Sequence, residues 1–379
     1  MAKAVICHLT SVHPAADIRI FHKECQSLLS AGYQTHLTVC GSQQIHEAGI
    51  QIHVAMEHVN GRFQRFSQAL WKMAKKAVEV DADIYHFHDP ELIAVALYLK
   101  RLGKIVIYDV HEDYPKQVMS KEWIAPFLRR PVSVLVDLVE MYACQKLDAI
   151  VAATDSIAHR FKSVHPNVVL VRNFPMLQEF PLLVEDSDLF NSSTDIDYDL
   201  CYIGVLSFQR GLGEMVNAAR KLNLRLVLAG PFSTQQEQQY VENLSADSSV
   251  DYLGILSRPD VAQLLRRSRI GMTVLNASPN HMEAYPTKLF EYMAAGLPVI
   301  ASDFPLWRDI VERNCCGICV DPQSLQSLES AIKTILGDEK KAQLMGSNGR
   351  QLVQQKFSWN TERIKLIDLY DKLASGKTL

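Results

Sequence analysis

The chain has 379 residues, of which 48% are hydrophobic and 21% charged, and its formal net charge is −3. This length predicts about two domains, because a single hydrophobic core seldom grows beyond about 250 to 300 residues. The near balance of charge excludes a basic nucleic-acid-binding module, which would need a clear surplus of Lys and Arg.

The N-terminus and the cysteines bear on the compartment. The opening residues MAKAVICHLT are typical of a strand and lack the pattern of a signal peptide. No apolar run approaches the roughly 18 residues that are needed to span a bilayer. Eight cysteines are scattered mostly among apolar neighbours, which suits buried free thiols, and the isolated CxxC of Cys316 and Cys319 is expected to belong to a strand. We therefore expect a cytoplasmic protein.

The first half of the chain alternates strands with helices. Strands are expected at 4–10, 35–40, 50–54, 83–87, 105–109, 149–152 and 167–171. Helices are expected at 17–31, 63–80, 90–102, 131–147 and 155–163. Uninterrupted apolar strands that alternate with helices predict a parallel, doubly wound sheet.

A polar and acidic stretch at 175–197, broken by Pro, Asn and Ser, predicts a linker, after which the alternation resumes. Strands are expected at 200–204, 225–229, 250–253, 270–274, 297–301 and 317–320. Helices are expected at 212–221, 259–268, 286–295, 305–312, 324–336, 342–356 and 361–373. Two such domains bind ligands at the carboxyl ends of their strands. The predicted division is an N-terminal domain at 1–172, a linker at 173–197, a C-terminal domain at 198–356 and a terminal helix at 357–379.

The stretch HMEAYPTKLFEYMAAGLPVIASD carries two carboxylates, Glu283 and Glu291, with seven residues between them. Pro286 and Gly296 bracket a short helix, since Pro favours the first helical position and Gly the position just past the last. A helix N-terminus offers unpaired N–H groups and partial positive charge to a phosphate. An anion between two carboxylates that accept hydroxyl hydrogen bonds suggests a phosphorylated sugar or a nucleotide.

The same stretch, with its E-x7-E spacing and the string PTKLFEYMAAGLPVIASD, resembles glycosyltransferase family 4. Seven further segments, all earlier in the chain, also resemble the family and occur in its order: HPAADIRIFHKECQSLLSAGYQTHL, DIYHFHDPEL, YDVHEDYP, NFP, YIGVLSFQRGLGEMV, LVLAG and VDYLGILSRPDVAQLLRRSRIGMTVLNAS. The resemblance implies a retaining sugar transferase of the α/β class with the GT-B fold, in which two Rossmann-like domains face each other. It also implies that the C-terminal helix crosses back to the N-terminal domain.

The resemblance assigns roles to both glutamates. Glu291 matches the family residue that accepts hydrogen bonds from the donor's ribose hydroxyls, and a carboxylate suits a vicinal diol because each oxygen can take one O–H. Glu283 matches the residue that contacts the donor sugar. Further donor contacts are expected from Gly204, Gly254, Tyr285, Thr287 and Leu289. Base preference would depend on contacts near Gly230 and at 252–254, which no motif fixes.

Two cations are expected at the donor diphosphate. Arg210 in FQRG stands where the family usually places a Lys, and a fixed cation there stabilises the leaving nucleotide. The family often carries an Arg shortly after the glycine that corresponds to Gly204, but this chain has Val205. We predict that Lys288, in the first turn of the E-x7-E helix, supplies the missing charge; the alternative is a solvated surface lysine.

His111 in DVHEDY follows an expected strand, so it should lie at the carboxyl edge of the first sheet. It matches the family histidine that touches the transferred sugar. In YHFHDPE, we expect His88 and Asp89 near the cleft and His86 packed inside. The loop SVHPAAD lacks the glycines common in the family, so its detailed role stays open.

We expect no metal. Twelve of the thirteen histidines lie in the first 170 residues, yet none forms a metal-ligand spacing such as HExxH. DxD triplets, which hold Mn²⁺ in a different transferase fold, occur at 81–83, 186–188, 195–197 and 197–199. Their places before a strand or near the linker argue against that function.

The predicted function is transfer of a sugar, with retention, from a nucleotide diphosphate sugar to a saccharide or lipid-linked acceptor. UDP-glucose is the favoured donor, with a GDP-sugar as the alternative, and no cofactor is expected. Two other functions stay open: a sugar-nucleotide epimerase of the same fold, and a non-catalytic nucleotide-sugar-binding partner. The basic and apolar segments at 63–80 and 121–130 allow either docking on anionic lipid or ordinary packing. No nucleic acid partner is expected.

Overall fold

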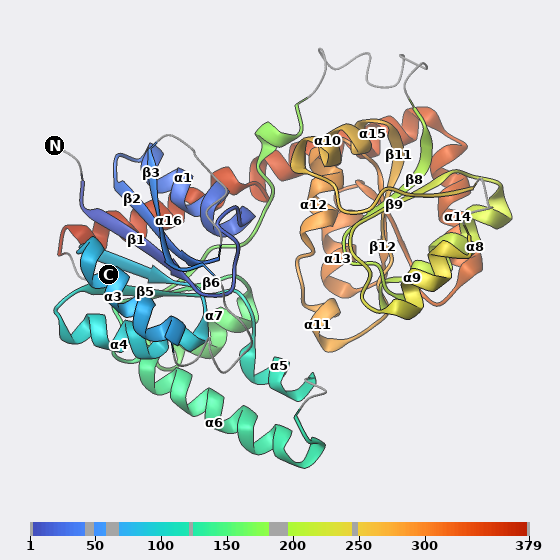
Figure 1. The fold of residues 1–379 in the computed structure, drawn as a ribbon. Helices are drawn as coiled ribbons and strands as arrows, with labels where there is room; N and C mark the ends of the chain where they lie inside the picture. Colours follow the sequence, from blue (N-terminus) through green and yellow to red (C-terminus); the bar gives the residue numbers. More distant parts are fainter. Residues whose placement is uncertain are drawn as a thin grey trace. The chain divides into compact units, whose positions relative to one another are not determined.

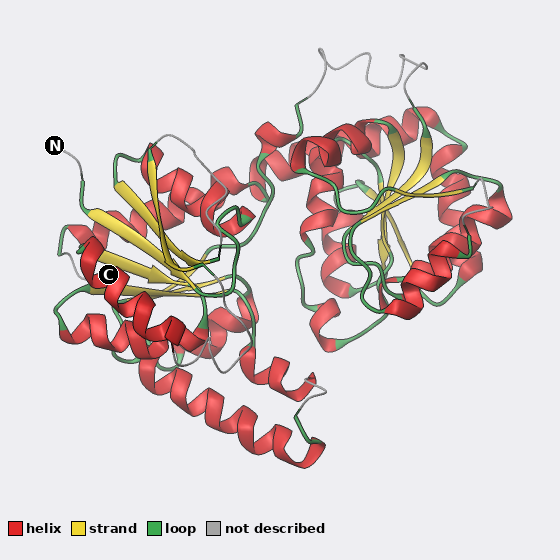
Figure 2. Cartoon of the chain, in the orientation of Figure 1, coloured by secondary structure: helices red, strands yellow, loops and turns green. Residues whose placement is uncertain are grey.

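The computed structural model describes residues 3–41, 49–57, 68–120, 124–181, 196–244 and 249–376. The chain divides into two compact units (Figures 1 and 2). The first unit consists of Met1–Asn173 together with Asn360–Leu379, and the second consists of Phe174–Trp359.

The first unit is built on a seven-stranded parallel sheet in the order β3-β2-β1-β4-β5-β6-β7. Its strands are β1 (Val5–Thr10), β2 (Gln34–Cys40), β3 (Ile50–Met56), β4 (Ile84–Phe87), β5 (Ile105–Val110), β6 (Ala149–Ala152) and β7 (Val168–Leu170). The order reverses direction at β1, so the chain winds outward from the middle of the sheet on both sides. This is the doubly wound arrangement predicted from the sequence.

Helices cover the sheet of the first unit. They are η1 (Ile18–Cys25, a π-helix), α1 (Gln26–Ser30), α3 (Leu70–Val80), η3 (Pro90–Leu92, a 3₁₀ turn), α4 (Ile93–Arg101), α5 (Tyr114–Ser120), α6 (Pro126–Cys144) and α7 (Asp155–Lys162). Nearly all of α16 (Trp359–Ala374) also belongs to this unit. The Tyr33 and Tyr370 side chains contact each other in the interior.

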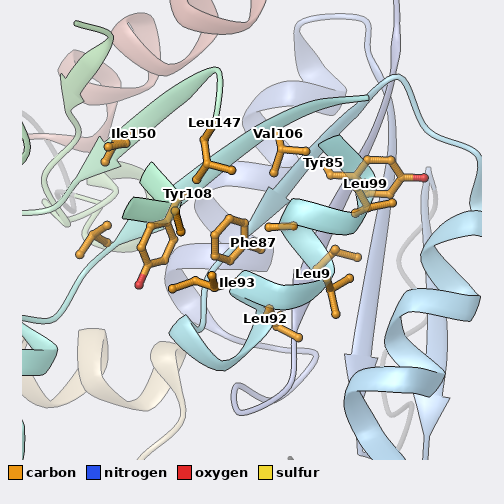
Figure 3. Close-up of a cluster of buried hydrophobic side chains, with 14 of the residues drawn as sticks. Leu9, Tyr85, Phe87, Leu92, Ile93, Leu99, Val106, Tyr108, Leu147 and Ile150 are labelled. Atoms are coloured by element: carbon orange, nitrogen blue, oxygen red, sulfur yellow. The ribbon is translucent and has the colours of Figure 1, made fainter. Parts of the chain in front are cut away.

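The core of the first unit lies between its sheet and the covering helices (Figure 3). Phe87 of β4 and Tyr108 of β5 are stacked, with ring centroids 4.4 Å apart and an interplanar angle of 3°. Leu9, Leu92 and Leu99 are buried in the same cluster. Both faces of these strands are buried, although the face opposite this cluster also carries His8, His86 and Asp109, so the strands lie in the middle of a sheet with helices on each side.

The second unit has a six-stranded parallel sheet in the order β10-β9-β8-β11-β12-β13. Its strands are β8 (Tyr198–Ile203), β9 (Leu226–Ala229), β10 (Val250–Tyr252), β11 (Ser268–Thr273), β12 (Val299–Ser302) and β13 (Gly317–Val320). The longer helices are α8 (Leu212–Leu222), α9 (Gln235–Glu242), α10 (Arg258–Arg266), α12 (Thr287–Ala294), α13 (Pro305–Val311), α14 (Leu325–Leu336) and α15 (Glu339–Lys356). Short turns are η4 (Leu177–Glu179), η5 (Phe208–Arg210) and α11 (Pro279–Met282).

Some predicted elements need correction. Helix α6 begins at Pro126, five residues before the predicted start, because Pro126 occupies the first turn and Pro131 lies inside the helix. The helices α5, α9 and α11 were not predicted, since they are short and weakly periodic. Residues 63–67 of the helix predicted at 63–80 lie outside the described part of the chain. In the described ranges, no helix is long and apolar enough to cross a membrane.

Candidate functional site

In the second unit, the E-x7-E stretch forms two short helices joined by a loop. Glu283 is the C-cap of α11 and is exposed, whereas Glu291 lies inside α12 and is buried. Pro286 is the N-cap of α12, with φ −69° and ψ 121°, so the helix starts one residue later than predicted. As predicted, one carboxylate therefore lies ahead of the helix N-terminus and the other within the helix.

Lys288, in the first turn of α12, points inward. Its side chain is buried, and its Nζ lies 3.7 Å from the centroid of the Tyr202 ring. No hydrogen-bond partner for this nitrogen occurs in the described residues. Burial and the nearby Arg210 hold the pKa of Lys288 well below its usual value, and Glu291 opposes them. The alternative of a solvated surface lysine is wrong.

The end of β8 explains how this amine fits. Gly204 follows the strand with φ +131°, and a Cβ added there would lie 3.2 Å from Lys288 Nζ. The lysine amine therefore lies beside the residue that directly precedes Val205, where the sequence lacks the expected arginine. Arg210 ends η5 and is partly buried. Burial raises the pKa of Tyr202 to about 12, while Arg210 opposes this shift, so the two side chains are close.

Glu291 has a partner that the sequence reading missed. Arg258, the first residue of α10, places Nη2 2.8 Å from Glu291 Oε1 and also pairs with Glu179. Its guanidinium lies over the Phe180 ring. The partly buried arginine thus fixes the carboxylate in one orientation. Because Arg258 and Glu291 are 33 residues apart, local sequence pattern gave no signal for this pair.

Three of the residues predicted to bind the donor lie around α12. Thr287 is the first residue of the helix. The Leu289 side chain is fully buried and its N–H donates to the Pro286 carbonyl, so a donor contact of Leu289, which stays a prediction, would have to be made by its backbone. Tyr285 packs among aromatic rings, with Phe290 6.1 Å and Phe357 6.5 Å away between centroids, which gives it a packing role.

The loops after β9 and β10 form the remaining part of this region. The Gly230 N–H donates to the Gly254 carbonyl, and the Tyr252 hydroxyl donates to the Gly230 carbonyl. Gly230 has φ +133°, and a Cβ there would lie 2.2 Å from the Gly204 carbonyl oxygen, so only glycine fits. Gly254 has φ +71° and open space where a side chain would be. Backbone groups of Gly204, Gly230 and Gly254 are thereby brought together.

In the first unit, His111 directly follows β5, as predicted. It is partly buried, and its Nε2 lies 3.1 Å from Nε2 of His13. Its Nδ1 lies 3.6 Å from Oδ2 of Asp109. The His13 pKa is raised by its hydrogen bond to Asp17, against the effect of burial. The loop whose role the sequence left open therefore supplies a histidine next to His111.

Beneath His111 lies a fully buried charged network. Arg19 donates two hydrogen bonds to Asp109, from Nε and Nη2, both at 2.7 Å. Burial alone would raise the pKa of Asp109, but Arg19 holds it well below the usual value. Burial and Asp109 raise the pKa of Glu24 well above its usual value, although Arg19 opposes them. A single guanidinium thus lies against two buried carboxylates.

The HFHD segment is entirely internal. His86 is packed as predicted, with Nδ1 2.8 Å from the Tyr370 hydroxyl. His88 is fully buried as well, and its Nδ1 lies 3.0 Å from Asp109 Oδ2. Asp89 is also buried, and its Oδ2 accepts hydrogen bonds from Thr10 and the Ser11 N–H. The Oδ1 atom of Asp89 has no hydrogen-bond partner in the described residues.

The DxD triplets have structural functions where the structure describes them. Asp83 Oδ2 accepts a hydrogen bond from the Val5 N–H, and Asp81 is the left-handed C-cap of α3. Asp197 pairs with Arg267. Residues 186–188 and 195 lie outside the described part of the chain.

Two protein-family models match the chain. The model described as Glycosyltransferase Family 4 matches residues 19–174, and that described as Glycosyl transferases group 1 matches residues 188–352. An uncharacterized glycosyltransferase of Methanocaldococcus jannaschii is 22% identical over 313 residues, which cover 76% of this chain and 75% of that protein. The matches therefore include both units.

Solved structures resemble the whole chain. Sucrose-phosphate synthase from Thermosynechococcus elongatus has a TM-score of 0.75 at 18% identity, covering 99% of this chain and 100% of the other. HepE from Anabaena, in complex with UDP and glucose, has a TM-score of 0.71 at 15% identity, covering 97% and 100%. At such low identity the likeness is one of fold.

Proposed function

The chain belongs to glycosyltransferase family 4 and has the GT-B fold, and from this premise we propose that it is a retaining hexosyltransferase. The donor is UDP-glucose or a similar UDP-hexose, and the acceptor is a saccharide or a lipid-linked saccharide of polysaccharide or glycoconjugate synthesis. The observation that carries the proposal is the buried Lys288 amine, which has no hydrogen-bond partner in the described residues and lies beside Gly204 and near Arg210.

The donor diphosphate accounts for this amine. Burying an ammonium group without an anionic partner costs several kcal/mol, so a position that keeps one needs a ligand that repays the cost. A diphosphate oxygen beside Gly204 would pair with Lys288, while Arg210 and the first N–H groups of α12 would hold the remaining negative charge. Charge that develops on the leaving UDP is then stabilised without a metal ion at this position.

The two glutamates complete the donor site. Glu291, held by Arg258 through one oxygen, would accept hydrogen bonds from ribose hydroxyls, and the exposed Glu283 would contact the donor sugar. The bond between the anomeric carbon and the phosphate oxygen breaks as the acceptor oxygen attacks from the same face. The acceptor proton passes to the departing phosphate oxygen. His111 of the first unit would contact the transferred sugar.

The UDP preference is supported by fold likeness to HepE in complex with UDP and glucose. A thermal-shift panel of UDP-, GDP-, ADP- and dTDP-sugars tests it, since a ligand at about 100 times its Kd adds about 2.7 kcal/mol of stability. UDP-sugars should give the largest shift. Proton NMR of the product then reads the anomeric configuration: an inverted product would contradict retention, and no shift with any nucleotide sugar would contradict the transferase proposal itself.

Helix α6 supports a membrane-bound acceptor. Large apolar side chains recur along one face of this helix and are exposed: Phe127, Leu128, Val134, Leu135, Leu138, Val139 and Tyr142. Basic residues flank the face, with Arg129 and Arg130 near its start and Lys146 over the Tyr142 ring at its end. An apolar face with basic ends fits an anionic lipid surface, where each cation contributes about 1 kcal/mol.

Flotation with anionic and neutral vesicles tests this docking. The protein should float with anionic vesicles, and the double variant Leu135→Glu/Leu138→Glu should stay in the soluble fraction. The control Leu344→Glu changes an equally exposed leucine on α15 and should float like the wild type. Failure of the wild type to float at moderate salt would contradict membrane docking and leave the transfer proposal standing.

A further inference from the structure

Four side chains converge in the interior of the first unit. His8 lies on β1 directly opposite His86 on β4, and His88 lies two residues further on, so it projects from the same face of the sheet. Glu24 reaches them from the π-helix η1, and π-helical turns often occur at functional sites. All four side chains are fully buried.

The distances within this cluster suit a small cation. His8 Nδ1 and His88 Nε2 are 2.9 Å apart. Glu24 Oε2 lies 3.8 Å from His8 Nδ1, 3.8 Å from His86 Nδ1 and 4.0 Å from His88 Nε2. Tetrahedral zinc with bonds of about 2.0 to 2.1 Å separates its ligand atoms by about 3.4 Å. Shifts of roughly half an ångström would reach that geometry.

Hydrogen bonds within the described residues leave the cluster incomplete. Neither carboxylate oxygen of Glu24 has a hydrogen-bond partner, and His86 Nε2 has none. Arg19 Nε lies 3.2 Å from Glu24 Oε1, but this guanidinium directs its hydrogen bonds to Asp109 and to the Val171 carbonyl. One cation therefore lies against two buried carboxylates, and Glu24 Oε2 faces three imidazoles without a hydrogen-bond partner in the described residues.

The surrounding groups resemble the outer partners of metal-bound histidines. His88 Nδ1 lies 3.0 Å from the ionised Asp109, which fixes the proton on that nitrogen and turns the Nε2 lone pair toward the cluster. The Tyr370 hydroxyl lies 2.8 Å from His86 Nδ1 and 3.4 Å from His8 Nε2. When His86 Nδ1 binds a cation, this hydroxyl can bond to His8 instead.

We propose that His8, Glu24, His86 and His88 form a buried structural site for a divalent transition metal, with zinc the preferred ion. Three imidazole nitrogens and one carboxylate oxygen are ligands that zinc accepts, and four protein ligands without solvent access make a closed site. The overlapping group of His88, Asp109 and His111 is less suitable because Arg19 already engages Asp109. The ion would join η1 to the sheet and give Glu24 Oε2 a partner.

Metal analysis tests the site directly. The full chain, purified without a histidine tag from zinc-supplemented medium, should contain about one zinc ion per molecule by inductively coupled plasma mass spectrometry. Glu24→Gln should lower this content about 10-fold or more, because an amide is a weaker ligand than a carboxylate. The control His53→Gln alters the His36–His53 pair, which also has nitrogens 2.9 Å apart but belongs to no metal-binding cluster of the described residues, and should keep the zinc.

A second measurement uses wild-type protein, so it does not depend on whether the variants fold. Wild-type protein unfolded with a chelator should refold with a lower melting temperature, and zinc should restore the original value. Cobalt in place of zinc should give the visible absorption of a tetrahedral ion, which only a bound cation can produce. Wild-type protein that holds far less than one metal ion and refolds equally well without zinc would overturn the proposal. Both measurements are independent of transferase activity.

Discussion

Arg19 in the first unit and Lys288 in the second are both buried cations, but only Arg19 has its hydrogen-bond partners in place. Arg19 donates to Asp109 and to the Val171 carbonyl. Lys288 Nζ lies over the Tyr202 ring without a hydrogen-bond partner in the described residues. A cation with internal partners stabilises the fold, whereas one without them is suited to a ligand that arrives later. By this comparison, Arg19 has a structural function and Lys288 belongs to a binding site.

The largest expected effect is the loss of stability that follows when Arg19 is replaced. Arg19→Met leaves Asp109 buried without its cation, so the free energy of unfolding should fall by about 3 to 5 kcal/mol. Urea unfolding followed by circular dichroism measures this. The control Lys3→Met removes the exposed pair with Asp371 and should cost at most about 1 kcal/mol. Equal stabilities of the two variants would contradict a structural function for Arg19.

Lys288→Met should show the opposite pattern, with stability unchanged or raised and kcat/KM for the donor lowered about 100-fold or more. The lysine pKa is lowered in the folded protein, so its ionisation opposes folding at low pH. That cost shrinks as pH rises from the lowered pKa toward the unfolded value, so the variant's stability advantage should be largest at low pH. Urea unfolding over a range of pH and steady-state kinetics measure the two effects.

Lys221→Met is the matched control for Lys288→Met, since Lys221 is an exposed helical lysine of the same unit. It should change neither stability nor kinetics appreciably. A Lys288→Met enzyme with wild-type kinetics would remove Lys288 from the site.

A smaller effect, on the KM for the donor, is expected when Arg258 is replaced, because Arg258 acts through Glu291. Arg258→Ala should raise the donor KM about 10-fold, because the carboxylate loses the charged partner that orients it. Glu291→Gln should raise it at least as much. The double variant Arg258→Ala/Glu291→Gln should be no worse than Glu291→Gln alone, since the two residues act as one unit. Additive losses would show that Arg258 contacts the donor independently.

Sequence reasoning succeeded where the signal is local. The proline and glycine around α12 were enough to predict the helix, and the missing arginine at Val205 drew attention to Lys288, which is buried. It failed where side chains meet from distant segments. Arg19 and Asp109 are 90 residues apart, and their contact depends on strand order and on the entry of η1, which no local pattern encodes. Histidine spacing likewise could not place His8 opposite His86.

The most direct test of the donor site is proton uptake on binding UDP, measured by titration calorimetry at pH 9 in two buffers of different ionisation enthalpy. Burial and Arg210 hold the pKa of Lys288 well below the ordinary lysine value of 10.5, so at pH 9 a larger fraction of this amine is neutral in the free protein than of an exposed lysine. A diphosphate bound to the amine raises that pKa again, so binding of UDP should be accompanied by proton uptake. Lys288→Met should bind more weakly without this uptake; equal affinity and equal uptake in both proteins would contradict the account.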